Sequence, residues 1–333
     1  MKAIVLSQGG GPEVLEYKEI PTPTPEPGQA LVRLKAAGLN HRDVWQRKGY
    51  AEKDPTILGS DGAGIVESVG RKEDNFWEGQ EVVINPSLYW GDKEDAPGPG
   101  FQILGIPTPG TYAEYVVVPV ENLAAKPAHL DFLQAAALPL AGLTAWRGIF
   151  TQGQLRPGQT LLLPGIGSGV AGMALMFAKK AGVRVIVTSS DEEKLAKAKA
   201  QGADIAVNYT QADWEQQVQD QAGTAGVDMV LDHSGEKTIP AGLRLIRPGG
   251  RVVYLGVTTG TECRFNIREA FYRQIHLTGT TMGSPREFEA MFRFVGMNKL
   301  VPEVNHRFPL EQAAQAHALM EQGGQYGKIM LEI

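Results

Sequence analysis

Closely spaced glycines between residues 160 and 190 are the part of the chain best suited to chemistry. The apolar run Leu161–Leu163 enters this turn, a helical segment follows it, and the β-branched run Val183–Val187 comes next. A strand, a glycine turn, a helix and a second strand place a pyrophosphate against the helix N-terminus. By spacing alone, Gly167-x-Gly169-x-x-Gly172 matches the common dinucleotide fingerprint. The predicted cofactor-binding residues of this turn are Gly165, Gly167, Ser168, Gly169 and Val170.

Two other interpretations of this stretch stay open. Residues 157–178 contain no charged residue and are about long enough to cross a bilayer. However, Pro164, Ser168 and the glycines interrupt the run, and Lys179-Lys180 ends it. The other alternative is a buried turn between a strand and a helix that binds no ligand.

The end of the second strand indicates which dinucleotide would bind. NAD-specific sites place an acidic residue there to bind the ribose 2′-hydroxyl, whereas this strand ends in Ser189 and Ser190. Serine hydroxyls can donate to a 2′-phosphate, and Lys194 adds a positive charge one turn later. Ser190 and Glu193 form a capping-box pattern that would put Asp191 in the first helical turn. The sequence thus predicts NADP(H) rather than NAD(H), with a solvated helix lysine as the alternative for Lys194.

Alternating strands and helices must position this turn. Strand patterns lie near residues 160–164, 183–188, 204–208, 228–233, 251–257 and 275–281, with helical patterns between most of them. This alternation predicts an α/β fold with a doubly wound parallel sheet. His233 ends one of these strands and is a candidate contact for the cofactor.

The first 120 residues have a different sequence pattern. Short strand-like runs separated by glycine and proline predict a small, partly open β-barrel. A long irregular stretch covers residues 84–112, and KIMLEI at the C-terminus is a strand expected to return to this barrel. We therefore expect a barrel domain at 1–124, a dinucleotide-binding domain at 125–283, and a C-terminal segment at 284–333 that rejoins the barrel.

Composition narrows the class of protein. The 333 residues carry a net charge of −5 with acids and bases interspersed, which argues against a nucleic-acid-binding surface. The N-terminus lacks the apolar core of a signal peptide, so we expect a cytoplasmic protein without a membrane partner. Cys263 is the only cysteine, which excludes an intrachain disulfide and a zinc site built from several cysteines.

Several motifs, in order, resemble the medium-chain dehydrogenase/reductase superfamily over essentially the whole chain. They are AAGLNHRDVW, ILGSDGAGIVESVG, GIGSGVAG, SSDEEKLAKAKAQGADIAVNY, GVDMVLDHSG and RPGGRVVYLGVTTG. The resemblance implies a GroES-like β-barrel catalytic domain, a Rossmann domain, and nicotinamide-dependent oxidoreduction in the cleft between them. It also shifts the register of the fingerprint, so that Ser168 and Ala171 stand where relatives often have glycine.

This chain differs from the zinc-dependent alcohol dehydrogenases of the superfamily at the positions of their metal ligands. Their cysteine ligand corresponds to Asn40, their histidine ligand falls in the turn Gly59–Asp61, and their third ligand falls in ALPLAGLT, which has no cysteine. His41, Asp43 and Asp61 could in principle hold a metal, but they do not reproduce a tetrahedral nitrogen and sulfur site. The chain therefore resembles the zinc-free branch, similar to quinone oxidoreductases and enone reductases.

The resemblance to that branch also assigns site residues. Asn40 and Asp43 match its Asn and Asp, and a tyrosine that contacts the 2′-phosphate corresponds to Tyr209. Thr144 and the loop Gly256-Val257-Thr258 are placed near the nicotinamide. A carboxamide such as Asn40 can donate a hydrogen bond to charge that develops on an acceptor oxygen. Asp43 could equally hold its own helix or a neighbouring backbone amide.

The predicted function is an NADPH-dependent oxidoreductase that transfers hydride to a small molecule, a quinone or an α,β-unsaturated carbonyl, without a metal. The alternatives are a zinc-dependent alcohol dehydrogenase using His41 and Asp61, and a protein that binds NADPH without turnover. Residues 274–282 read as a strand that related proteins pair across subunits, which predicts a homodimer.

Overall fold

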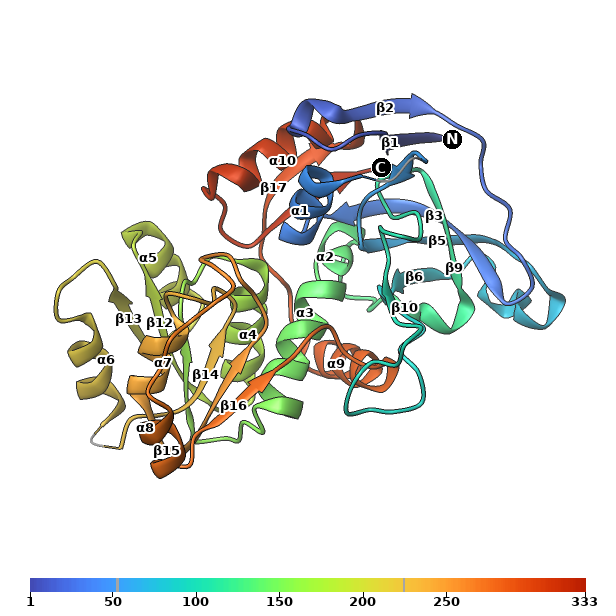
Figure 1. Ribbon diagram of the computed structural model, residues 1–333. Coiled ribbons are helices and arrows are strands. Elements are labelled where there is room, and N and C mark those ends of the chain that lie inside the picture. The colour runs from blue at the N-terminus through green and yellow to red at the C-terminus, as the bar shows by residue number, and fades with distance from the viewer. Residues whose placement is uncertain (52–53, 224) are drawn as a thin grey trace. The chain divides into compact units, whose positions relative to one another are not determined.

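The structure is a computed structural model that describes residues 1–51, 54–223 and 225–333. The chain divides into two compact units, one formed by Met1–Leu143 with Gly283–Ile333 and the other by Thr144–Met282 (Figure 1). The first unit extends beyond the expected boundary at residue 124, because helix α2 (Phe132–Ala136) packs against strands β3 and β5 of the barrel.

The first unit is built around strand β3 (Gln29–Gly38). Its main sheet has the order β10-β6-β5-β3-β18-β17, and β9 also pairs with β3. The C-terminal strand β18 pairs antiparallel with β3, so the end of the chain completes the N-terminal barrel. The other strands of this unit are β1 (Lys2–Leu6), β2 (Leu15–Glu19), β4 (Thr56–Ile57), β5 (Asp61–Val69), β6 (Glu81–Ile84), β7 (Ser87–Leu88), β8 (Gln102–Ile103), β9 (Tyr115–Pro119), β10 (Leu123–Ala125), β17 (Val304–Pro309) and β18 (Lys328–Glu332).

Helices of the first unit cover the ends of this sheet. Helix α1 directly follows β3, and α10 packs against β18 and shares an apolar core with β1. The C-terminal segment contributes two helices to this unit, and a 3₁₀ turn at Leu310–Gln312 precedes the second of them. The helices are α1 (His41–Gly49), α9 (Pro285–Asn298) and α10 (Ala313–Gln322), and α3 (Pro139–Trp146) begins here.

The second unit contains the predicted doubly wound parallel sheet. Its strand order among the described residues is β13-β12-β11-β14-β15-β16, with every pair parallel. The strands are β11 (Thr160–Leu163), β12 (Arg184–Ser189), β13 (Ile205–Asn208), β14 (Val227–Asp232), β15 (Ile246–Tyr254) and β16 (His276–Gly279). The order reverses between β11 and β14, and ligands of such sheets bind at that point, outside the carboxyl ends of the strands.

The connecting helices of this unit lie on both faces of the sheet (Figure 1). Helix α4 contacts β11 and β12 on one face, and α6 and α7 pack against each other on the other. The helices are α4 (Gly169–Lys180), α5 (Glu192–Ala200), α6 (Trp214–Ala222), α7 (Ile239–Leu245) and α8 (Ile267–Tyr272). In the described parts of the chain, no helix is long and apolar enough to span a membrane.

Candidate active site

The glycine turn has the geometry of a phosphate cradle. Gly165 and Gly167 have φ angles of 72° and 125°, a region that favours glycine because it has no Cβ. The turn is tied to the next strand, since Ile166 N–H donates to the carbonyl of Thr188 at 2.8 Å. Ser168 caps α4 by accepting a hydrogen bond from Ala171 N–H at 3.2 Å. The first-turn N–H groups of α4 therefore face the carboxyl end of the sheet, where a helix N-terminus attracts an anion.

His233 joins this turn from the end of β14. Its Nε2 lies 3.3 Å from the hydroxyl of Ser168, and its Nδ1 lies 3.3 Å from the hydroxyl of Ser234. Removal of the ring from water lowers the pKa of His233, so the imidazole is neutral near pH 7. A Cβ at Gly256 would lie 2.1 Å from the carbonyl oxygen of His233. The backbone at Gly256 therefore approaches His233 so closely that a residue with a Cβ would not fit at this position.

The end of β12 differs in one respect from the sequence prediction. Asp191, not Ser190, caps α5, because the Oδ1 of Asp191 accepts hydrogen bonds from the N–H groups of Glu193 at 2.8 Å and Lys194 at 3.2 Å. Asp191 keeps an extended backbone, so the helix starts one residue later than expected. Ser189 is buried, and its hydroxyl accepts from Asp191 N–H at 3.1 Å. The carboxylate nearest the strand end is thus used as a helix cap.

The remaining predicted cofactor residues of this strand end lie together. Ser190 accepts a hydrogen bond of 3.2 Å from the phenol of Tyr209. The side chain of Lys194 passes over the glycine turn, and its Cδ would lie 3.0 Å from a Cβ built on Gly167. The structure therefore brings Ser190, Lys194 and Tyr209 to one side of the turn.

A cavity of about 300 Å³ opens at the same carboxyl edge of the sheet. Gly165 and Tyr209 line it, together with residues that sequence reasoning missed, which are Trp214, Ser234, Lys237, Thr238 and Thr259. Ser234, Lys237 and Thr238 follow β14, Thr259 follows β15, and Trp214 begins the helix after β13. Position after a strand end is the signal that could have found them, since ligands bind beyond the strand ends. Thr144 is buried elsewhere in this unit, and its hydroxyl contacts the sulfur of Met282 at 3.9 Å.

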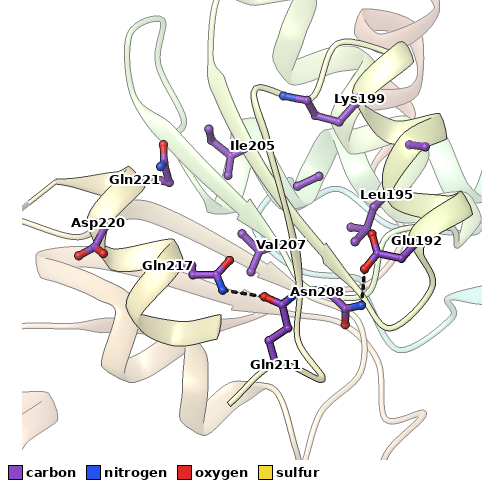
Figure 2. A pocket seen from close by; sticks show the side chains of 12 residues that line it. Glu192, Leu195, Lys199, Ile205, Val207, Asn208, Gln211, Gln217, Asp220 and Gln221 are labelled. Carbon is purple, nitrogen blue, oxygen red and sulfur yellow. Dashed lines mark hydrogen bonds between the residues drawn. The ribbon is translucent and has the colours of Figure 1, made fainter. Parts of the chain in front are cut away.

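A larger cavity, of about 550 Å³, lies between α5, β13 and α6. Figure 2 shows that polar side chains line it, with Gln217 bonded to Gln211 at 2.7 Å and Asn208 bonded to Glu192 at 2.6 Å. None of the predicted cofactor residues lines it. We therefore place the candidate cofactor site at the glycine turn.

The first unit contains a second candidate site, a buried polar cluster of Asn40, Asp61 and Lys328. Lys328 Nζ lies 2.7 Å from Oδ2 of Asp61 and 2.8 Å from Oδ1 of Asn40. The Nδ2 of Asn40 donates to the same Asp61 oxygen at 3.0 Å. All three side chains are at least nine-tenths buried. Sequence reasoning selected Asn40 and Asp61 but missed Lys328.

Strand register explains this cluster. Asn40 lies two residues beyond the end of β3, Asp61 starts β5, and Lys328 starts β18. Because β5 and β18 both run antiparallel to β3, their first residues meet the end of β3. A lysine at the start of a mostly apolar strand was the available signal, since a buried lysine requires a partner.

Asp43 lies beside this cluster at the start of α1. Its Oδ2 accepts hydrogen bonds from Asn40 N–H at 2.8 Å and from the phenol of Tyr112 at 2.9 Å. Burial raises the pKa of Asp43 to about 6, against the lowering effect of nearby Arg42. These contacts support the alternative role of Asp43, which is to hold the first turn of its helix.

The residues at this cluster do not fit a catalytic zinc ion. Asp61, the carboxylate that accepts from the side chain of Asn40, already binds the ammonium group of Lys328, and its Oδ1 accepts from Leu140 N–H at 2.7 Å. Ser60 accepts from Arg42 at 3.0 Å and donates to Leu104 O at 2.6 Å. Within residues 1–51, 54–223 and 225–333, no group of three or more His, Cys, Asp or Glu side chains could hold a metal.

The chain combines a barrel unit with a unit built on a doubly wound parallel sheet, and comparisons with known proteins identify its family. The model for the alcohol dehydrogenase GroES-like domain matches residues 26–128, and that for the zinc-binding dehydrogenase domain matches residues 169–296. The chain belongs to the medium-chain dehydrogenase/reductase superfamily of nicotinamide-dependent oxidoreductases.

The names of similar proteins in this family describe different activities. The zinc-type alcohol dehydrogenase-like protein YogA of Leptosphaeria maculans is 33% identical, over 96% of this chain and 94% of its own. A quinone oxidoreductase of Rattus norvegicus is 29% identical, over 99% and 97%. The crystal structure of an NAD-dependent alcohol dehydrogenase superposes with a TM-score of 0.95 at 44% identity, and each chain is covered completely.

Proposed function

We propose that this protein is an NADPH-dependent reductase of quinones or α,β-unsaturated carbonyl compounds that works without a catalytic metal. The ion pair of Lys328 with Asp61 at 2.7 Å carries the proposal, because it holds a protein cation 2.8 Å from Oδ1 of Asn40, the residue that corresponds to the cysteine ligand of zinc. A zinc ion would have to compete with that ammonium group for Asp61.

The second unit would hold the cofactor. The glycine turn and the N-terminus of α4 would bind a pyrophosphate, and the neutral His233, 3.3 Å from the hydroxyl of Ser168, would add hydrogen-bonding groups. Ser190, Lys194 and Tyr209 would bind the 2′-phosphate, while the Asp191 carboxylate is engaged as the cap of α5. The cavity beside Trp214 would take the adenine ring, and Thr144 and Gly256–Thr258 would lie near the nicotinamide.

The first unit would act on the acceptor. Bound NADPH supplies the hydride. Asn40 would donate a hydrogen bond from Nδ2 to the acceptor oxygen and stabilise the negative charge that develops there. A simple ketone gains several kcal/mol from a metal at this step, whereas a quinone or enone spreads the charge by conjugation and needs less help. Activated acceptors therefore suit this site better than alcohols or ketones.

Zinc-independent reduction is tested by titrating the purified protein with NADPH and NADH, followed by turnover with a panel of quinones, enones and aliphatic alcohols. We expect tighter NADPH binding, reduction of enones or quinones, and activity unchanged by chelator. The name of the similar crystal structure favours NAD-dependent alcohol oxidation as the second candidate. Tighter NADH binding with alcohol turnover, or about one zinc per chain, would overturn the proposal.

We also propose a homodimer that forms through β16, and a cytoplasmic location. β16 is an edge strand of the sheet, and the neighbouring α8 exposes Ile267, Phe271 and Tyr272, whose exposed fractions are 71%, 65% and 83%. Large apolar side chains gathered beside an open strand edge are typical of a protein interface.

A further inference from the structure

The ammonium group of Lys328 donates all of its hydrogen bonds within the first unit. It donates to Leu39 O at 2.7 Å, to Asn40 Oδ1 at 2.8 Å and to Asp61 Oδ2 at 2.7 Å. The residue is 2% exposed. A lysine ammonium has three N–H donors, so each has a partner and none remains for an external ligand. Its effect on chemistry must therefore act through one of these partners.

Asn40 is the partner whose orientation depends on this arrangement. Its Oδ1 accepts from Lys328, and one N–H of its Nδ2 donates to Asp61 at 3.0 Å. Rotation of the carboxamide by half a turn would face Nδ2 with the ammonium group and Oδ1 with the carboxylate. Both contacts would be repulsive inside a buried site, where electrostatic interactions are strong. The second N–H of Nδ2 therefore keeps one direction.

We propose that Lys328 is a positioning residue that fixes the carboxamide of Asn40 as a hydrogen-bond donor and strengthens that donor by polarising it. The inference rests on the proposed function of Asn40 toward an acceptor oxygen. The ammonium group withdraws electron density from Oδ1, which makes the N–H groups at Nδ2 better donors. A cation of the protein thus supplies part of the electrostatic effect of a metal ion.

A double-mutant cycle tests whether Lys328 acts through Asn40. We expect Lys328→Met to lower kcat for an enone about tenfold to a hundredfold, with the Kd for NADPH changed less than about twofold. In an Asn40→Ala background, Lys328→Met should cause little further loss, because the residue that it positions is absent. Equal losses in both backgrounds would show a merely structural role and overturn the proposal.

Lys126→Met is the matched control for loss of a buried lysine. Lys126 belongs to the same unit, its side chain is 6% exposed, and its Nζ lies 3.1 Å from Glu81 and 2.6 Å from Leu130 O. Neither of these partners is Asn40, so the Lys126→Met variant should keep the wild-type kcat. Because Lys328→Met leaves Asp61 without its cation, Lys328→Arg and the neutral pair Lys328→Met with Asp61→Asn provide folded alternatives. Arginine should recover more activity than the neutral pair.

A readout without turnover separates this inference from the proposed function. In protein labelled with ¹⁵N-asparagine, the side-chain NH₂ signals of Asn40, assigned by their loss in Asn40→Ala, should exchange slowly with water. They should shift and exchange faster in Lys328→Met but not in Lys126→Met. Unchanged Asn40 signals in Lys328→Met would overturn the inference even in an active enzyme. If the wild type reduces no acceptor, the proposed function fails while these signals still decide the role of Lys328.

Discussion

Tyr112 donates a hydrogen bond of 2.9 Å to Asp43, and both side chains are fully buried. This contact favours the ionised carboxylate, yet burial still raises the pKa of Asp43 from 3.8 to about 6. The folded protein therefore binds a proton between those two pH values where the unfolded chain does not. It follows that the contribution of Asp43 to stability falls as the pH rises from about 4 to about 6.

Asp43→Asn should remove this pH dependence. Relative to wild type, the variant should gain stability between pH 4 and pH 7.5, by up to about 3 kcal/mol, because two pKa units correspond to that free energy. Denaturant unfolding at several pH values measures the difference. Asp54→Asn, an exposed change in the same unit, serves as the control. A pH-independent difference between Asp43→Asn and wild type would contradict the assigned pKa.

His317 should act in the opposite direction. Burial, with Arg47 nearby, lowers the pKa of His317 from 6.5 to about 3, so the folded protein keeps it neutral where the unfolded chain takes up a proton. Stability should therefore fall by about 1.4 kcal/mol per pH unit below pH 6.5, until about pH 3. His317→Gln, which can still accept the hydrogen bond from Arg47, should flatten this decline in unfolding experiments. An equally steep decline in the variant would rule out His317 as the cause.

Gly167→Ala should weaken cofactor binding with little loss of fold. The φ angle of 125° is unfavourable for alanine, and the added Cβ would lie 3.0 Å from Cδ of Lys194. We expect the Kd for NADPH to rise at least about tenfold, because both the turn and the lysine must shift. Gly172→Ala is the control, since no atom lies within 4 Å of its Cβ position. Calorimetric titration of both variants checks this, and equal affinities would contradict it.

Lys194→Met should discriminate between the two nicotinamide cofactors. Loss of the charge near a 2′-phosphate should raise the Kd for NADPH about tenfold and leave that for NADH within about twofold. Lys197→Met is a matched control, because Lys197 is on the same helix and its Nζ lies 2.6 Å from Glu193. Equal effects of Lys194→Met on both cofactors would place the lysine away from the 2′-position.

Phe271→Glu combined with Tyr272→Glu should convert the proposed dimer into a monomer. Both rings are mostly exposed on α8, so burying the new charges in an interface would be costly, while the fold of the unit should persist. Light scattering gives the mass, and circular dichroism checks the fold. Met297→Glu, at an exposed position outside this unit, is the control. A monomeric wild type, or a double variant that stays dimeric, would contradict the proposed interface.

The sequence by itself determined the parts whose signals are local. The run from Leu161 to Val187 predicts strand, turn, helix and strand because hydrophobic period and glycine backbone preference are properties of neighbouring residues. The doubly wound sheet followed from the same alternation. The cap of α5 was misplaced by one residue, because Ser190 and Asp191 are both good caps and only the backbone conformation distinguishes them.

Only the tertiary structure decided which groups surround Asn40. Lys328 reaches Asp61 across 267 residues of sequence, through the register of β18 and β5 on either side of β3. Pairing between strands so distant in sequence is set by the packing of the whole barrel, which no local pattern encodes. The sequence determined that the usual zinc-ligand residue types are missing, and the fold determined that an ammonium group lies beside Asn40.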